Sequence, residues 1–249
     1  HNAATEVGQA RNDLQLRDYR AVETQLDDLK GRFPENLEVR RLDRVWQVHN
    51  MAEFTLSVEQ AFQSATSSQG GTGIGIGAEL YSAPINYNWR VFGAGYVAKQ
   101  QLPEGEGAIT LRRSAIGAEY RGGDLIASLE GTVSAYGPET GTTLTSGINQ
   151  GRVGTRARAI WSANDQWDIG GSAEIFARDT PLRALRQGVT ANAISANVSY
   201  RESELRGFHL QGTAMDFSDG NLRTGLNGRY VQRLITQPGL IFDGVLGLA

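Results

Sequence analysis

The sequence predicts a mainly β protein, a transmembrane antiparallel β-barrel of the outer-membrane type, preceded by a short helical segment. After about residue 51 the hydrophobic pattern has a period of two and keeps it to the C-terminus. We count about eleven such segments, each roughly 9–12 residues long, which is the length that a tilted strand needs to cross a bilayer. Their connections alternate between short turns and longer polar loops, as in outer-membrane barrels.

Residues 3–50 are expected to be helical. Apolar residues recur at helical spacing, Gly31 and Pro34 interrupt the pattern, and Asn36 can cap the helix that follows. The order of helix, break, helix, proline and helix matches the two-helix unit of a tetratricopeptide array. A generic helical hairpin packed on the next domain is the alternative. We therefore place a helical domain at 1–48 and the barrel at 49–249.

The alternation along each strand separates an apolar face from a polar one. In the segment 53–62, Phe54, Leu56 and Val58 share one face, whereas Glu53 and Glu59 lie on the other. The segments 125–134 and 194–201 alternate in the same way. In a barrel the apolar face contacts lipid and the polar face lines a water-filled lumen. A soluble sheet protein, with these apolar residues packed on a second layer, is the alternative.

Turns and aromatic residues fit the same topology. The short connections are predicted at 82–88, 120–124, 162–166, 201–206 and 236–239. Longer, polar ones are predicted at 63–72, 98–107, 136–151 and 178–191, with 217–222 as a short exception on that side. Aromatic residues near the short turns are expected to form an interfacial girdle: Tyr81, Tyr87, Trp89, Tyr120, Trp161 and Trp167.

Glycine is unusually frequent, with 31 residues of 249, and some of it alternates with isoleucine. Gly73, Gly75 and Gly77 fall on the lumen face of one strand, where glycine adds nothing to packing. They thin the wall beside a bulky ligand, admit a loop folded into the bore, or allow a bend needed for closure. The sequence leaves these three explanations open.

Composition disfavours several functional classes. The formal net charge of −3 gives no basic footprint for nucleic acid. The chain has no cysteine, which excludes disulfides and thiolate metal sites, and its three histidines form no pair with metal-ligand spacing. Residues 73–78 and 93–98 match a Gly-x-Gly-x-x-Ala pattern, but neither opens a helix as dinucleotide binding requires. We therefore expect no cofactor, no metal and no catalytic residue.

A lipid-modifying enzyme embedded in the barrel is an alternative that one residue keeps open. His209 lies on a strand and could meet a serine at one rim of the barrel. A serine and a histidine within about 3 Å of each other would indicate such an enzyme. The competing interpretation is that His209 is a polar residue of the lumen.

The predicted lumen face carries acidic side chains on five strands. One interpretation is an acidic track that attracts cations, strengthened by the low-dielectric wall. The other is ordinary lumen polarity, in which these acids pair with arginines such as Arg156 and Arg178. The acidic residues are Glu53, Glu59, Glu79, Glu119, Glu130, Asp168 and Glu174.

The loop at 179–191 is a candidate gate or plug at the outer rim. It contains Pro181, Arg183, Arg186 and Gly188 within the sequence DTPLRALRQGVTA. A solvated loop with no gating role is the alternative.

Three stretches closely resemble the PgaA/HmsH family of outer-membrane porins. They are RRLDRVWQVHNMAEFTLS at 40–57, SAPINYNWRVFGAGY at 82–96, and DTPLRALRQGVTANAISANVSY at 179–200 followed by TAMDFSDGNLRTGL at 213–226. The similarity extends over nearly the whole chain in the same order. It includes the VHN junction between the last helix and the first strand.

The resemblance implies a function and partners. The family exports poly-β-1,6-N-acetyl-D-glucosamine, a biofilm polysaccharide, through a barrel of sixteen strands in the outer membrane. The resemblance also implies an electronegative passage suited to a partly deacetylated polymer, and a periplasmic helical domain that docks the polymer and a periplasmic deacetylase. Such a protein would be a conduit in contact with membrane lipid and would not be an enzyme.

The ends of the chain differ from the family pattern. The final residues, IFDGVLGLA, include no closing strand and no terminal aromatic residue, and few helical repeats precede the barrel. We therefore expect the sequence to be part of a longer protein. A secretin for another polysaccharide, such as cellulose or alginate, is the main alternative, and an anionic polymer would require a basic lumen.

Overall fold

The computed structural model describes residues 2–63, 71–102, 107–138, 150–203, 205–237 and 240–248. Three helices come first: α1 (Ala3–Gln15), α2 (Tyr19–Arg32) and α3 (Leu37–His49). Each begins at a polar side chain that accepts a hydrogen bond from a backbone amide of its first turn, namely Asn2, Asp18 and Asn36. The predicted cap at Asn36 is therefore present.

The helices share a small apolar core. Its nine buried residues come from all three helices, at the helical spacing that the sequence shows. They are Val7, Ala10, Tyr19, Val22, Leu26, Leu29, Val39, Leu42 and Trp46. None of the helices in the described part of the chain is long and apolar enough to cross a membrane.

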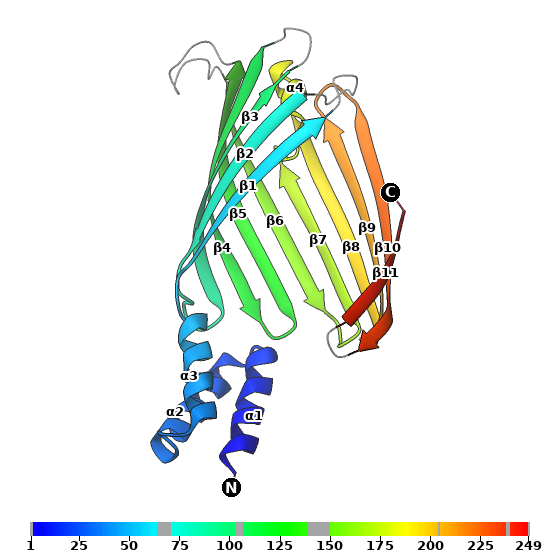
Figure 1. Ribbon diagram of the computed structural model, residues 1–249. Coiled ribbons are helices and arrows are strands. Elements are labelled where there is room, and N and C mark those ends of the chain that lie inside the picture. Colours follow the sequence, from blue (N-terminus) through cyan, green and yellow to red (C-terminus); the bar gives the residue numbers. More distant parts are fainter. Residues whose placement is uncertain are drawn as a thin grey trace.

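Eleven strands follow in a single antiparallel sheet, each paired with its neighbours in sequence. The strands are β1 (Glu53–Gln63), β2 (Gly71–Tyr81), β3 (Trp89–Gln101), β4 (Ala108–Gly122), β5 (Leu125–Pro138), β6 (Gln150–Ser162), β7 (Trp167–Ile175), β8 (Ala191–Ser203), β9 (Arg206–Phe217), β10 (Leu222–Gln237) and β11 (Leu240–Leu248). A fourth helix, α4 (Leu182–Arg186), lies between β7 and β8. Figure 1 shows the sheet curved into a wall, with β1 and β11 at its edges. The predicted fold class and strand count are confirmed.

The convex face of the sheet carries exposed apolar side chains. Phe54, Leu56 and Val58 on β1 are 61–65% exposed, and Ile74 and Ile76 on β2 are nearly half exposed. No second layer of described polypeptide covers them. A soluble protein could not leave so continuous an apolar surface in water. This face is the lipid-contacting outside of a barrel, as the alternation predicts.

Aromatic residues gather on this outer face at the end with the short turns. Trp89 packs on Tyr120 with ring centroids 5.1 Å apart, and Trp167 packs on Tyr200 at 4.6 Å. Two of the residues expected in this girdle have other positions. Tyr81 lies on the inner face, where its hydroxyl donates to Glu79, and Tyr87 lies in a turn and donates to Glu23 of α2.

The helices contact the same end of the sheet (Figure 1). Arg17, between α1 and α2, donates to the carbonyl of Gly123 in the β4–β5 turn at 3.0 Å. Arg90 of β3 donates to Glu53 at 2.9 Å and to the carbonyl of His49 at 3.4 Å. These contacts join the last helix to the first strands of the wall. The helices and the short turns therefore lie at the same end of the sheet, and so on the same side of the membrane.

Candidate functional site

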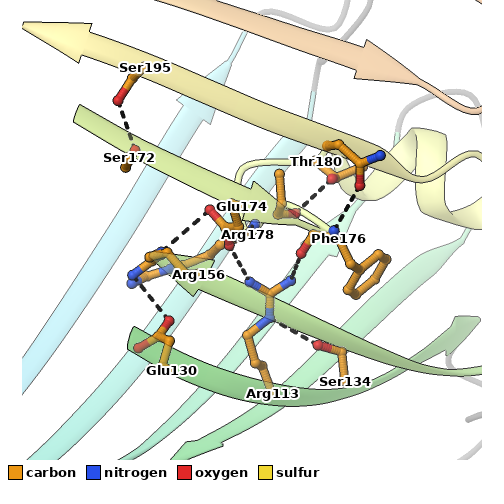
Figure 2. Close-up of polar contacts among 12 residues, drawn as sticks. Arg113, Glu130, Ser134, Arg156, Ser172, Glu174, Phe176, Arg178, Thr180 and Ser195 are labelled. Atoms are coloured by element: carbon orange, nitrogen blue, oxygen red, sulfur yellow. Dashed lines mark hydrogen bonds and ion pairs between the residues drawn. The ribbon is translucent and has the colours of Figure 1, made fainter. Parts of the chain in front are cut away.

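The concave face of the sheet holds a network of charged side chains centred on Arg113 of β4 (Figure 2). Only 6% of Arg113 is exposed. Its guanidinium donates three hydrogen bonds of 2.9 Å, to Ser134 Oγ, to Glu174 Oε1 and to the carbonyl of Phe176. A buried arginine needs its donors satisfied, and here β5 and the end of β7 supply the acceptors. Arg113 therefore ties β4 and β5 to the end of β7.

Glu174 on β7 connects this arginine to a second one. Its carboxylate lies 3.5 Å from Arg156 Nε, and it also accepts the backbone N–H of Arg178 at 2.7 Å. Arg156 in turn lies 3.4 Å from Glu130. The strand register explains the arrangement, because Glu130, Arg156 and Glu174 are directly opposite one another on three adjacent strands. Residues that are opposite each other on neighbouring strands and point to the same face lie in contact, so the register brings these charges together.

The segment 176–190 leaves β7 and folds over the inner face. Phe176 has a positive φ of 57°, unusual for a residue with a side chain, and its ring packs on Tyr136 and lies beside the Arg113 guanidinium. Leu185 of α4 is 1% exposed. It belongs to an apolar cluster on the inner face whose other members are Ala98, Leu102, Ile109, Leu111, Tyr136 and Phe176.

The candidate gate residues all lie in this segment. Pro181 precedes α4, Arg183 and Arg186 are on the helix, and Gly188 follows it with a φ of 79°. The helix contacts β4 and β5, so the segment crosses the inside of the wall. Such packing differs from the solvated-loop alternative, and a gating role remains a prediction.

The glycine stripe on β2 makes room for an aromatic ring from β3. A Cβ on Gly75 would lie 2.7 Å from the Tyr96 hydroxyl, which is closer than such atoms approach. A Cβ on Gly77 would lie 2.7 Å from Ser57 Oγ and 3.5 Å from the Tyr96 ring. A Cβ on Gly73 would be tight against the carbonyl of Lys99, at 3.3 Å. The stripe therefore lets Tyr96 lie flat on the wall beneath the folded segment.

Five of the seven predicted lumen acids form ion pairs with arginine. Besides Glu130 and Glu174, the pairs are Glu53 with Arg90 at 2.9 Å, Glu59 with Arg178 at 3.3 Å, and Glu119 with Arg121 at 2.6 Å. Glu79 accepts from Tyr81, and Asp168 accepts from Ser162 at 2.7 Å. The pairing matches the mixed-charge alternative. A role for these acids in attracting a cationic polymer stays a prediction.

Ser199 and His209 form the serine–histidine pair that the enzyme alternative requires, with Ser199 Oγ 2.8 Å from His209 Nδ1. The register places Asp168 beside Ser199 and Arg229 beside His209. A nucleophilic serine needs its histidine to be oriented by a carboxylate on the other ring nitrogen. Among the hydrogen bonds of the described residues no carboxylate binds His209, and Asp168 binds Ser162 instead. The distance criterion is thus met, and Asp168, Ser199, His209 and Arg229 form a polar row across four adjacent strands of the wall.

Residue patterns did not identify Arg113, Tyr96, Phe176 and Leu185 as members of the network. One signal was present: Ile109 and Leu111 are apolar at inward positions of β4, where the lumen pattern calls for polar residues. An apolar patch inside a barrel indicates that a folded segment covers it, here α4.

Comparisons with known proteins agree with this geometry. The family model described as the PgaA membrane beta barrel domain matches residues 48–249. The poly-beta-1,6-N-acetyl-D-glucosamine export proteins of Escherichia coli K12 and O157:H7 are each 30% identical over 243 residues, 97% of this chain and 28% of theirs.

A solved bacterial polysaccharide outer membrane secretin superposes with a TM-score of 0.65 at 26% identity, covering 80% of this chain and 62% of the secretin. This chain thus spans little more than a quarter of the curated export proteins it matches. The family match, the single eleven-stranded sheet and its two chemically distinct faces lead to one conclusion: the chain belongs to the PgaA membrane β-barrel domain family.

Proposed function

We propose that this chain forms part of an outer-membrane porin that exports poly-β-1,6-N-acetyl-D-glucosamine. The observation that carries the proposal is the similarity over 97% of the chain to export proteins for that polymer. The geometry supports it, because an exposed apolar outside and a charged inside are what a water-filled conduit through lipid requires. The protein would act by passive conduction, with no bond made or broken.

The ion pairs of the inner wall suggest how a sugar chain would pass. Each pair offers carboxylate acceptors and guanidinium donors to hydroxyl and amide groups, and a partly deacetylated polymer would add ammonium groups that compete with the arginines. Conduction needs binding that is strong enough for entry and weak enough for exit. The Glu59–Arg178 pair fits this requirement, since the two side chains are 61% and 27% exposed, and exposed pairs are weak.

The helical unit is proposed to be the end of a periplasmic tetratricopeptide-like domain that docks a periplasmic deacetylase. Its position at the short-turn end of the sheet supports this, because short turns of outer-membrane barrels face the periplasm. The acidic residues would then meet the polymer after it leaves the helices. Biofilm formation would depend on that export.

The test is export by the whole porin in a strain that lacks its own. A triple variant with Glu59→Gln, Glu79→Gln and Glu130→Gln keeps side-chain size but removes three charges from the wall. We expect surface polymer to fall at least severalfold while the amount of folded porin in the outer membrane is unchanged. A matched variant that removes three charges from exposed turns outside the wall, Asp124→Asn, Asp165→Asn and Asp219→Asn, should export normally. Undiminished export by the triple variant would reject the acidic-residue mechanism, and no polymer export by the native porin would reject the function.

A second candidate is export of an anionic polysaccharide of the alginate type. One observation favours it: a cavity of about 470 Å³ on the inner face of β7–β10 is lined by several arginines. These are Arg201, Arg206, Arg229 and Arg233, with Asp168 as the acidic residue. The same export assay with both polymers decides between the candidates, because a conduit selective for anions would transport alginate in preference.

A further inference from the structure

The side chain of Arg178 occupies a cation site on the inner wall. Its guanidinium carbon lies 4.2 Å from the centroid of the Tyr96 ring, within the range of a cation–π interaction. The same guanidinium lies 3.3 Å from Glu59 Oε1. An aromatic face and a carboxylate together form a cage for a positive charge, and here the occupant comes from the segment 176–190.

Two features indicate that the cage is built into the wall. Tyr96 can lie flat only because Gly75 beneath it has no side chain, since a Cβ there would meet the hydroxyl at 2.7 Å. Glu59 stands directly opposite Gly75 in the register of β1 and β2. The wall itself therefore sets the position of the ring, and Glu59 stands beside it on the neighbouring strand.

Arg178 is held more firmly by its backbone than by its side chain. Its N–H donates to Glu174, which Arg113 fixes in turn, and Leu185 anchors the segment in the apolar cluster. The guanidinium itself forms a long ion pair with a carboxylate whose side chain is 61% exposed, and such pairs contribute little. The side chain can therefore leave the cage while the segment stays in place.

A cavity adjoins the cage. It has a volume of about 440 Å³, and its lining includes Glu59, Gly75, Tyr96, Arg178, Asp179 and Arg183. A cavity of this size is at the lower end of those that hold small organic ligands. A hexose ring placed there would have its substituents within reach of both Tyr96 and Glu59.

We propose that Tyr96 and Glu59 form a subsite for a hexosamine unit that bears a free ammonium group, and that Arg178 occupies it until such a unit displaces the guanidinium. An ammonium group replaces the guanidinium in both contacts, the aromatic face and the carboxylate. An N-acetylated unit has no charge to exchange and does not compete. The subsite would thus distinguish amine from acetamide on the polymer. This inference rests on the proposed function, because a sugar must enter the lumen to reach it.

The test measures binding of two oligosaccharides to the whole porin in detergent by titration calorimetry. The probes are β-1,6-linked glucosamine oligomers and their fully N-acetylated counterparts. We expect Arg178→Ala to tighten binding of the amine oligomer about fivefold to tenfold, because an internal competitor with one cation–π contact and one ion pair is removed. Binding of the acetylated oligomer should not change.

Two double variants and a control assign the effect to the cage. Adding Tyr96→Leu or Glu59→Gln to Arg178→Ala should abolish the gain. Arg152→Ala, which removes the same charge from the inner face of β6, should leave the ratio of the two affinities unchanged. If Arg178→Ala does not assemble, Arg178→Gln removes the charge at similar length. Equal effects on both oligomers, or no effect of removing the arginine charge, would overturn the subsite.

Export assays separate this inference from the proposed function. Normal polymer export with no change in amine preference in the variants rejects the subsite and leaves the function intact. If the native porin does not export the polymer but the oligomer affinities follow the expected order, the proposed function is rejected and the subsite is retained.

Discussion

Replacing Leu185 by alanine should loosen the segment 176–190 from the inner wall. Leu185 is 1% exposed within the apolar cluster of the inner face. Truncation of a leucine buried in this way costs about 3 kcal/mol when the cavity does not collapse. Among the described elements, α4 makes several contacts only with β4 and β5. The lost free energy therefore weakens docking of the segment on the wall. A cost of that size raises the undocked fraction roughly a hundredfold.

Cysteine labelling can measure this opening, because the native sequence has no cysteine. Ala98 lies in the same cluster and is 8% exposed, so Ala98→Cys should react slowly with a polar thiol reagent. Adding Leu185→Ala should accelerate labelling by up to roughly a hundredfold, in line with the docking energy. Ser128→Cys, on the inner face away from the segment, serves as the matched control and should label at an unchanged rate. Equal labelling of Ala98→Cys with and without Leu185→Ala would refute the docked segment.

Two further predictions concern the helical unit and the lipid face. Burial, with repulsion from Arg90 and Arg121, lowers the pKa of His49, so docking of α3 favours the neutral imidazole. That stabilisation is complete above a pH of about 6.5 and is lost as pH falls from there toward the lowered pKa. Hydrogen exchange corrected for intrinsic rates should show acid-weakened protection of α3 that is absent in His49→Phe; the same acid effect in both would contradict this. Separately, Ile76→Arg on the lipid face should cost about 2–4 kcal/mol in unfolding from bilayers, against little for Ile76→Leu. Equal stability of the two variants would show that Ile76 does not face lipid.

Local patterns were sufficient for the architecture. The alternation in β1 and β2 required apolar side chains on one face, because side chains of a strand point alternately to its two sides. The cap at Asn36 and the break at Pro34 indicated where the second helix ends and the third begins. The turn residues fixed which ends of the strands are joined closely, and so which end of the sheet carries the helices.

The network of the inner face depends on distances in space that no local pattern encodes. Residues from β4, β5 and β7 meet at Arg113 because register brings distant parts of the sequence to one place, and a shift of one residue would reverse every side chain. The strand pattern assigned Glu59 and Glu174 to the lumen but carried no information on which arginine each would meet. Strand register settled this for Glu174, and folding of the segment 176–190 over Tyr96 settled it for Glu59, so that the acids form paired charges and not an unopposed acidic surface. Strand periodicity specifies the face of a residue, whereas its partner depends on strand register and on how the loops pack.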